Sequence, residues 1–383
     1  MRLAERWHGL FRAPKLAWDI LARGEYRFVY DQMPVRLRRM PAAKRVNLLS
    51  SGMNLLHRRL QPWSMPLHMQ FELTNFCNLR CPVCPTGIGG IRRKHQSMPL
   101  DLFRQVIDAV GPYLLTASLW AWGEPTLHPQ LGRILQAARR HPFVTFLSTN
   151  GQNLCDRKVV DALVENPPTY LIVAIDGLTD AVNTRFRRGA RLAAALEGIQ
   201  RLAELKRRRG VQLPVLHMRF IVMKHNQHQL DDLIGFAKEH QFDLLTVRTL
   251  SIIDTEAPDA VHQGMIPEQA AYCAYAYDQQ SRVRKTDFYC LEPFWFPSVF
   301  ADGTVVSCEQ DYNAQRPLGI VGAGQDFRSI WFGGQAREIR REVRDRGETV
   351  SFCRNCPYRD RSTTDVSIRA HFLNDSIKYD SLA

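Results

Sequence analysis

The sequence predicts an α/β fold built around a mostly parallel β-sheet. Short apolar runs of the strand type alternate along the chain with longer segments of helical periodicity. Several of these runs are apolar throughout, as in the segment 170–175, which reads Tyr-Leu-Ile-Val-Ala-Ile. Continuous apolar runs are typical of strands that helices cover on both faces. The alternation therefore predicts neighbouring parallel strands joined by right-handed crossovers.

The alternation extends from residue 67 to residue 250. Strand-like runs lie at 67–73, 115–121, 143–148, 169–176, 214–223 and 243–250. Helical segments lie between them, at 100–110, 129–140, 156–165, 190–208 and 227–240. A last helix is expected at 268–277. Periodicity alone leaves open whether the sheet is flat or curled into a barrel.

Residues 1–66 precede the alternation and are expected to form a basic, helical extension. They hold 13 Lys and Arg against 4 Asp and Glu, so they carry +9 of the chain's net charge of +13. Prolines divide this arm into short pieces. In the last piece an apolar residue recurs every three or four positions, at Val46, Leu49, Met53, Leu56 and Leu60. This spacing predicts an amphipathic helix with Arg58 and Arg59 turned away from the apolar stripe.

Several interpretations of the arm remain open. An apolar stripe usually packs against its own domain. Alternatively, the helix lies on an anionic membrane surface, with Trp7, Phe11 and Trp18 contributing from upstream. A basic arm can also bind nucleic acid or an anionic substrate, or simply be solvated surface.

Nine cysteines are a high count for 383 residues. The N-terminus lacks the charged, apolar and small-residue order of a signal peptide, and no apolar run is long enough to span a bilayer. The thiols are therefore expected to be metal ligands in a reducing cytoplasm rather than a disulfide framework.

Three of these cysteines, Cys77, Cys81 and Cys84, share one short loop after the first expected strand. Their spacing is C-x3-C-x2-C. Three thiolates on one loop can hold a 4Fe–4S cluster and leave one iron open, whereas a structural zinc site needs four closed ligands. No fourth ligand lies within zinc-like spacing, so a zinc loop is the less favoured alternative.

This loop resembles that of the radical S-adenosylmethionine (radical SAM) superfamily. The resemblance rests on the segment 72–81, Glu-x-Thr-x-x-Cys-Asn-x-x-Cys, and on the apolar Val83. It implies a partial (βα)6 barrel of the TIM type over residues 67–282. In that family the open iron chelates S-adenosylmethionine (AdoMet), and the reduced cluster cleaves it to methionine and a 5'-deoxyadenosyl radical. The radical abstracts a hydrogen atom from the substrate.

The resemblance extends to the loop after the second expected strand. Gly123, Glu124 and Pro125 are similar to the family's Gly-Gly-Glu-Pro motif, although Trp122 replaces the first glycine. The resemblance implies that Glu124 and its neighbouring backbone receive the AdoMet amino group. A glycine before the glutamate lets the backbone approach the cofactor closely.

Two later strand ends carry weaker signals. The segment 148–151, Ser-Thr-Asn-Gly, is similar to the family's Thr-Asn-Gly, so Ser148 and Asn150 are expected to hydrogen-bond the ribose or carboxylate of AdoMet. An ordinary turn is the alternative. Asp176 stands where relatives have Ser-x-Asp-Gly, with Ala174 in place of the serine. The basic residues at 185, 187, 188 and 191 can meet an anion or be solvated surface.

A second cysteine set lies in residues 283–383, at Cys290, Cys308, Cys353 and Cys356. Its spacing resembles the SPASM/twitch extension of radical SAM enzymes, which binds one or two auxiliary iron–sulfur clusters. Ser362 and Val366 stand where the full pattern continues with cysteines, so the resemblance implies one auxiliary cluster. From the thiol count alone, a zinc site with four cysteines fits equally well.

Glu309 follows Cys308 directly. In the SPASM-type sulfatase-maturating enzymes an acid beside the matching cysteine deprotonates the substrate, so the resemblance implies that Glu309 is a catalytic base. A surface glutamate is the alternative.

The resemblance implies an enzyme that attacks an unactivated C–H bond. Oxidation or epimerisation of a sugar-like or other polar small molecule is favoured, because residues 1–66 show no β-rich peptide-recognition module. Modification of a peptide or protein side chain is the alternative, and a non-catalytic iron–sulfur or zinc protein on nucleic acid is a third. An electron donor such as flavodoxin or ferredoxin is expected as a partner. Nucleic acid is not expected, because no RNA-binding pattern of aromatic and basic residues is recognisable.

Overall fold

The computed structural model describes residues 14–251, 264–278, 281–283, 289–322, 324–354, 356, 358 and 367–379. Four residues that enter the sequence expectations, Trp7, Phe11, Ser362 and Val366, lie outside the described residues.

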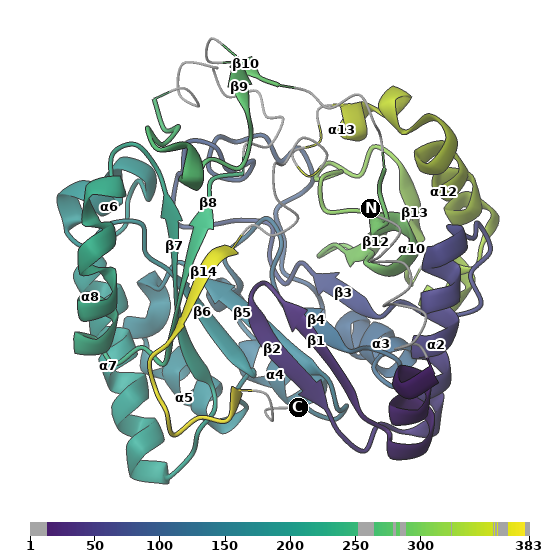
Figure 1. Ribbon diagram of the computed structural model, residues 1–383, viewed down its shortest axis with the longest axis horizontal. Coiled ribbons are helices and arrows are strands. Elements are labelled where there is room, and N and C mark those ends of the chain that lie inside the picture. Colours follow the sequence, from purple (N-terminus) through teal and green to yellow (C-terminus); the bar gives the residue numbers. More distant parts are fainter. Residues whose placement is uncertain are drawn as a thin grey trace.

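The centre of the molecule is a ten-stranded sheet in the order β13-β12-β11-β3-β4-β5-β6-β7-β8-β14. The six strands that run from β3 to β8 are parallel and adjacent in sequence order. They are β3 (His68–Phe71), β4 (Thr116–Ser118), β5 (Val144–Thr149), β6 (Tyr170–Ala174), β7 (Val215–Val222) and β8 (Leu244–Thr249). All six expected strands are present, and the sheet curves as an open barrel (Figure 1). The predicted α/β fold is confirmed.

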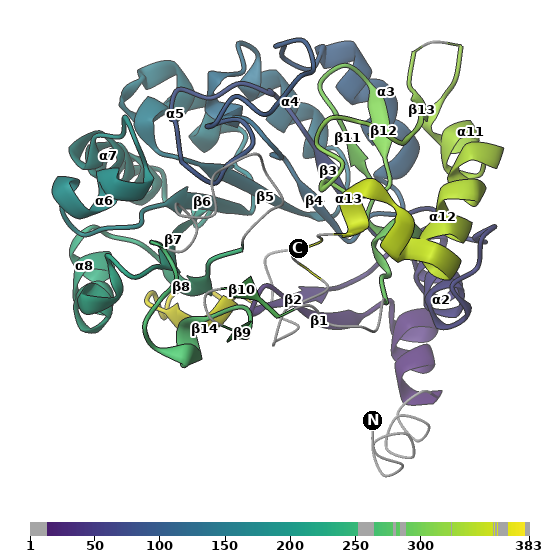
Figure 2. The same cartoon turned by 90° about the horizontal axis from the view of Figure 1, so that it is seen from above.

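Helices cover the convex face of this sheet (Figure 2). They are α3 (Leu100–Val110), α4 (Leu131–Ala138), α5 (Arg157–Glu165), α6 (Asp180–Phe186), α7 (Leu192–Arg209) and α8 (Leu233–Glu239). Short 3-10 helices precede three of them, namely η2 (Pro125–Leu127), η3 (Gln152–Cys155) and η4 (Gln227–Asp232). The largest apolar cluster joins helices and sheet, with Phe103, Ile134 and Ile199 packed near Leu171 and Met218.

The C-terminal region extends both edges of the same sheet. Strand β11 (Ser298–Val299) pairs in parallel with β3, and β12 (Thr304–Val306) and β13 (Pro317–Ile320) continue from it in antiparallel order. At the opposite edge, β14 (Ser367–Phe372) pairs antiparallel with β8. A turn at Gly303 joins β11 to β12, with a φ of 88° that favours glycine.

The helices of this region are short except for one. They are α10 (Glu292–Trp295), α11 (Phe327–Trp331), α12 (Gly334–Arg346) and α13 (Ser351–Arg354), with the 3-10 helix η6 (Gly347–Thr349) between the last two. Arg340 of α12 is buried and donates hydrogen bonds to Leu60 O (3.3 Å) and Pro293 O (3.0 Å). It thereby ties the N-terminal arm to the C-terminal region.

The helix expected at 268–277 does not form, and that prediction was wrong. Only one 3-10 turn, η5 (Ala270–Tyr272), is present, and a short hairpin follows from β9 (Tyr277–Asp278) and β10 (Ser281–Arg282). Ala274 and Tyr275 are buried just beyond the turn. Contacts with the core thus override the helical propensity of the segment.

The N-terminal arm was expected to be helical throughout, and this was wrong, because it contains a β-hairpin in addition to helices. After the π-helical turn η1 (Asp19–Arg23), β1 (Tyr26–Tyr30) pairs antiparallel with β2 (Met33–Leu37). The hairpin lies across the concave face of the sheet (Figures 1 and 2). Met33 and Val35 are buried there in one cluster with Phe146 and Tyr170. The open side of the barrel is therefore partly covered from within the chain.

Helix α2 (Ala42–His57) confirms the predicted helix. Of its apolar stripe, Leu49 packs against the domain, but most of the other residues do not. Val46, Met53 and Leu56 are 58%, 44% and 77% exposed, whereas Asn47 and Asn54 are buried.

The buried asparagines explain this orientation. Asn47 bonds both the backbone N–H and the carbonyl of Met65, at 2.8 and 3.2 Å. Asn54 accepts from the N–H of Trp63 and donates to the hydroxyl of Ser64. Buried backbone groups need such partners, so the polar side of the helix faces inward. Within the described residues, no helix is both long enough and apolar enough to cross a membrane.

Candidate active site

The three-cysteine loop lies at the carboxyl end of β3, where ligands of parallel α/β sheets commonly bind. Cys77, Cys81 and Cys84 share an apolar cluster with Leu79 and Val83, among others. Burial raises the pKa of Cys77 to about 12 and that of Cys81 to about 11, and the neighbouring Cys84 raises both pKa values further. Three thiols that share one apolar site fit the ligand set of a 4Fe–4S cluster with one open iron.

Hydrogen bonds reach this loop from the end of β5. The side-chain amide of Asn150 donates to Cys77 Sγ (3.5 Å) and to Asn78 Oδ1 (2.7 Å), and Leu79 N donates to Cys77 Sγ (3.3 Å). Hydrogen bonds to the sulfur ligands are one means of tuning a cluster's potential. Asn150 therefore lies beside the cysteine loop, and Ser148, two residues earlier, is half-buried on the strand.

Glu124 joins the loops after three strands. Its carboxylate accepts hydrogen bonds from the N–H and hydroxyl of Thr126, the hydroxyl of Thr149 and the N–H of Asn150, at 2.6 to 3.0 Å. Its backbone N–H donates to Phe76 O at 2.9 Å. Burial raises the pKa of Glu124, and the hydrogen bonds oppose that rise. Since these protein donors occupy the carboxylate, Glu124 holds the backbones of the three loops together.

The neighbours of Glu124 are sterically constrained. A Cβ on Gly123 would lie 2.0 Å from Thr74 O, so only glycine permits this close approach. Pro125 is buried and begins η2.

A buried ion pair lies at the end of β6. Asp176 is fully buried, and its carboxylate accepts from Arg187 Nε (2.6 Å) and from Ile221 N (2.8 Å). Arg187 also favours the thiolate of Cys81, lowering its pKa against the larger effect of burial. The other basic residues of this segment, Arg185, Arg188 and Arg191, are exposed. The sequence left the role of Asp176 open. In the structure Asp176 holds Arg187 beside the cysteine loop.

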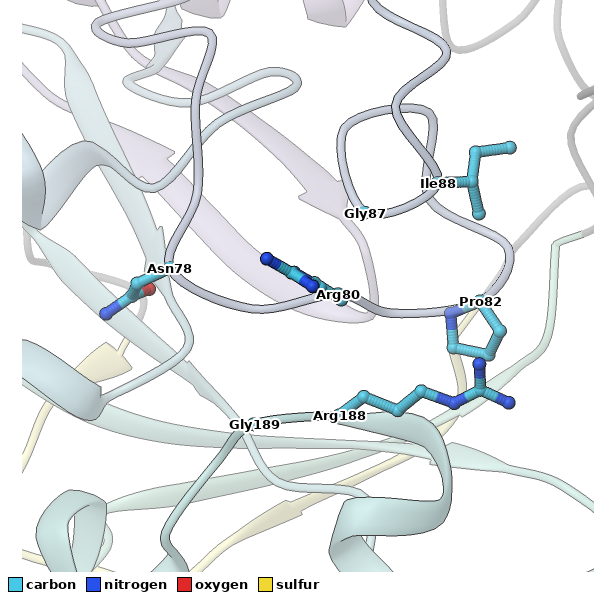
Figure 3. A pocket seen from close by; sticks show the side chains of 7 residues that line it. All are labelled: Asn78, Arg80, Pro82, Gly87, Ile88, Arg188 and Gly189. Atoms are coloured by element: carbon cyan, nitrogen blue, oxygen red, sulfur yellow. The ribbon is translucent and has the colours of Figure 1, made fainter.

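An open pocket of about 510 Å3 lies beside the cysteine loop. Asn78, Arg80, Pro82, Gly87 and Ile88 of the loop line it, together with Arg188 and Gly189 (Figure 3). The exposed guanidinium groups of Arg80 and Arg188 give this rim a positive charge.

The second cysteine set also gathers in one place. Cys290 precedes α10, Cys308 follows β12, and Cys353 lies in α13. Burial raises the pKa of these three thiols, and the nearby Cys356 raises each of them further. Among the described residues, no three Cys, His, Asp or Glu side chains are arranged to hold a single metal ion. Of the four thiols, that of Cys353 is buried and the other three are partly buried. A set of four neighbouring thiols fits the ligands of an iron–sulfur cluster.

Glu309 lies between the two cysteine sets. Gln70 of β3 donates to its carboxylate at 2.6 Å, and the hydroxyl of Tyr358 donates to the other carboxylate oxygen. Trp122 donates from its indole N–H to Glu309 O at 2.8 Å. Glu309 is therefore a half-buried residue with defined partners, facing the interior of the barrel from beside Cys308.

The sequence did not predict several of these partners. Trp122 was noted only because it replaces the first glycine of the motif, and Gln70 was not identified as a site residue. The signal for Gln70 is the alternation of polar residues His68, Gln70 and Glu72 within the apolar first strand, which places all three on one face. Nothing in the sequence indicates that Tyr358 contacts Glu309.

Comparisons with known proteins agree with this geometry. Residues 71–237 match the model of the radical SAM superfamily, and residues 290–357 match that of SPASM, an iron-sulfur cluster-binding domain. The chain is 26% identical over 202 residues to the tungsten-containing aldehyde ferredoxin oxidoreductase cofactor-modifying protein of Pyrococcus furiosus, covering 52% of this chain and 56% of that protein. It is 25% identical over 183 residues to the mycofactocin maturase MftC of Mycobacterium ulcerans, covering 48% and 47%. The matches thus span about half the length of these relatives.

A solved structure shows the same fold. SuiB of Streptococcus suis, bound to its precursor peptide SuiA, superimposes with a TM-score of 0.54 at 15% identity, covering 77% of this chain and 71% of that chain.

Proposed function

The chain belongs to the radical SAM superfamily and carries a SPASM domain, and we propose that this enzyme oxidises or epimerises a polar small molecule at an unactivated C–H bond. Its cofactors are a 4Fe–4S cluster, AdoMet and an auxiliary iron–sulfur cluster. When bound, the reduced cluster and AdoMet supply a 5'-deoxyadenosyl radical that abstracts hydrogen. The observation that carries the proposal is the polar interior between the two cysteine sets, where Glu309 and Gln70 meet.

In this proposal each site residue has a role. Cys77, Cys81 and Cys84 hold the AdoMet-binding cluster, and Cys290, Cys308, Cys353 and Cys356 hold the auxiliary one. Gly123, Glu124 and Pro125 shape the backbone that receives the AdoMet amino group, while Ser148 and Asn150 lie on the side of its ribose and carboxylate.

Glu309 is proposed as the base that takes up a substrate proton. Gln70 and Tyr358 donate to its two carboxylate oxygens and so fix the carboxylate in one orientation. A proton acceptor beside Cys308 suits an oxidation, because loss of a proton then occurs next to a redox centre.

Peptide modification is the second candidate. It is favoured by the SPASM domain and by the fold shared with peptide-bound SuiB. The hairpin β1–β2 packs on the concave face, with Met33 and Val35 buried against Phe146 and Tyr170, and this partial covering favours the smaller substrate.

A reduced flavodoxin or ferredoxin is proposed as the electron donor. The positive rim of Arg80 and Arg188 lies directly outside the cysteine loop and suits an acidic carrier (Figure 3).

We further propose that the enzyme is cytoplasmic and binds an anionic membrane surface through the outer side of α2. Eight of the 14 exposed large hydrophobic side chains among the described residues come from the arm, including Trp18 (64% exposed) and Trp63 (61%). Residues 14–66 hold ten Lys and Arg against three acids. The acids Asp19, Glu25 and Asp31 are each paired with an arginine. Exposed apolar side chains with excess positive charge suit an anionic lipid surface.

The decisive experiment is anaerobic reconstitution followed by reduction with dithionite in the presence of AdoMet. The wild type is expected to form 5'-deoxyadenosine and to contain about eight irons, which corresponds to two four-iron clusters. Cys81→Ala removes one of the three ligands and should abolish deoxyadenosine formation, while its circular dichroism stays that of a folded chain. A matched Cys155→Ala variant, at an exposed cysteine, should keep wild-type activity. Full activity of Cys81→Ala, or zinc in place of iron in the wild type, contradicts the proposal.

A further inference from the structure

The hairpin β1–β2 crosses the concave face of the sheet (Figure 1). Two polar residues, Tyr30 and Asp31, lie at its tip. Tyr30 stacks on Phe146, with ring centroids 4.7 Å apart, and its hydroxyl lies 3.4 Å from Ser118 Oγ. Asp31 follows at the tip of the hairpin. The carboxylate of Asp31 forms ion pairs with Arg219 (2.6 Å) and Arg248 (3.7 Å).

The two arginines lie on one face of neighbouring strands. In the register of β7 and β8, Arg219 pairs with Thr246 and Ile221 pairs with Arg248. Arg219 and Arg248 therefore point to the same face, because residues two apart on a strand share a side. That face is the concave one, since both reach Asp31 of the hairpin.

Within the described residues, this cluster brings two cationic side chains to one carboxylate. The guanidinium groups of Arg219 and Arg248 share the one carboxylate of Asp31. Arg219 is buried, with 6% of its surface exposed. The Nε atoms of Arg219 and Arg248 are buried, and neither has a hydrogen-bond partner in the described part of the chain. Burial, together with the nearby Arg248, lowers the pKa of Arg219 to about 10. A buried charge without full pairing is costly, so a ligand with negative charge would stabilise it.

The cluster lies close to the proposed chemistry. Arg219 pairs in register with Ala174, two residues before Asp176, whose partner Arg187 adjoins the cysteine loop. On the other side, Tyr30 lies within electrostatic reach of both Arg219 and Glu309. A ligand on the arginines would thus lie between the AdoMet elements and Glu309.

We propose that Arg219 and Arg248 bind an anionic oxygen group of the substrate, a carboxylate or a phosphate, while Asp31 holds the two guanidinium groups from the hairpin. Guanidinium groups match both anions through paired N–H donors. The inference rests on the proposed function and narrows it. The substrate is a polar molecule with an acidic group at a defined distance from the carbon attacked.

Calorimetric titration of the anaerobically reconstituted protein tests this site. Methyl phosphate and acetate are the two probes, and the stronger binder identifies the anion class. The wild type is expected to bind at least one of them. Arg219→Met should bind at least about tenfold more weakly, because it loses hydrogen bonds to a charged partner. Arg157→Met serves as the matched control, since this arginine is 89% exposed on α5, and its affinity should equal that of the wild type.

A second variant predicts the opposite change. Asp31→Asn removes the carboxylate that competes for both arginines, so it should bind the preferred probe several-fold more tightly than the wild type. This variant decides the outcome if Arg219→Met does not fold. A wild type that binds neither probe, equal affinity in Arg219→Met, or no gain in Asp31→Asn overturns the inference. Deoxyadenosine formation by the wild type tests the proposed function separately, so either can fail alone.

Discussion

Gly123 lies where the loop after β4 crosses the chain after β3, and it shows how one residue controls the site. Its missing side chain lets Thr74 O approach within 2.0 Å of where a Cβ would stand. The next residue, Glu124, then bonds Phe76, Thr126, Thr149 and Asn150. The loops at three strand ends are thus held together by a glycine and a buried carboxylate.

Gly123→Ala is therefore expected to reduce AdoMet cleavage by tenfold or more, because the loop must shift to relieve the contact. A shift of about 1 Å at a positioning element can cost roughly a hundredfold in rate. The measurement is deoxyadenosine formed per iron-loaded protein. Gly235→Ala, on α8, is the control, because its Cβ would meet nothing within 4 Å. Wild-type cleavage by Gly123→Ala would remove the role given to this loop.

Among the elements, β3 and β7 carry polar side chains into the buried interior. His68 Nδ1 lies 2.6 Å from Thr116 Oγ1, and His217 Nε2 lies 2.7 Å from Thr246 Oγ1. Both histidines are fully buried beneath the hairpin, and burial lowers the pKa of His68 to about 3 and that of His217 well below its usual range. The strands thus hold two imidazoles in the neutral form.

Stability should therefore fall as the pH drops below about 6.5. In the unfolded chain each imidazole takes up a proton near its ordinary pKa of about 6.5, whereas His68 in the folded chain stays neutral to about pH 3. The unfolded state binds more protons in this window, so the free energy of unfolding decreases as the pH falls through it.

His68→Gln should reduce the loss of stability between pH 7 and pH 5.5 by about 1 kcal/mol, since one such group is removed. Anaerobic urea unfolding at both pH values measures the difference. His57→Gln, at the exposed end of α2, should retain the wild-type dependence. An unchanged pH dependence in His68→Gln would mean that this imidazole takes up its proton with the same pKa in the folded and unfolded chain.

At the scale of the whole molecule, the arm presents an apolar surface that the fold leaves uncovered. This surface consists of the exposed side of α2 together with Trp18 and Trp63. Asn47 and Asn54 anchor the helix from its buried side. Binding to lipid would bring the enzyme to amphipathic or lipid-linked substrates without changing the site.

The double variant Val46→Glu/Leu56→Glu tests this surface. The wild type should sediment with vesicles containing phosphatidylserine, and less so at high salt, which screens the charges of the arm. The variant should sediment several-fold less, because it places carboxylates against anionic lipid. Val211→Glu/Ile234→Glu changes two exposed apolar residues elsewhere and should behave as the wild type. Equal sedimentation of both variants, or none by the wild type, contradicts membrane binding.

The sequence by itself determined the parallel sheet and the cofactor class, because both depend on short-range patterns. Cys77, Cys81 and Cys84 lie within one loop, and each strand is marked by its own apolar run. The orientation of α2 could not be read in the same way, since its apolar stripe suggests burial. Asparagine contacts with residues 63–65 reverse that orientation.

Only the tertiary structure decided what fills the interior of the barrel. Gln70 meets Glu309 across 239 positions of the chain, and Asp31 meets Arg219 across 188. The periodicity of apolar residues along the sequence does not predict such pairs, because they form only when the sheet curves and the hairpin folds across it. The physical reason is that the charged and hydrogen-bonding side chains inside a barrel find partners on other strands. No single segment of the sequence therefore specifies both members of a pair.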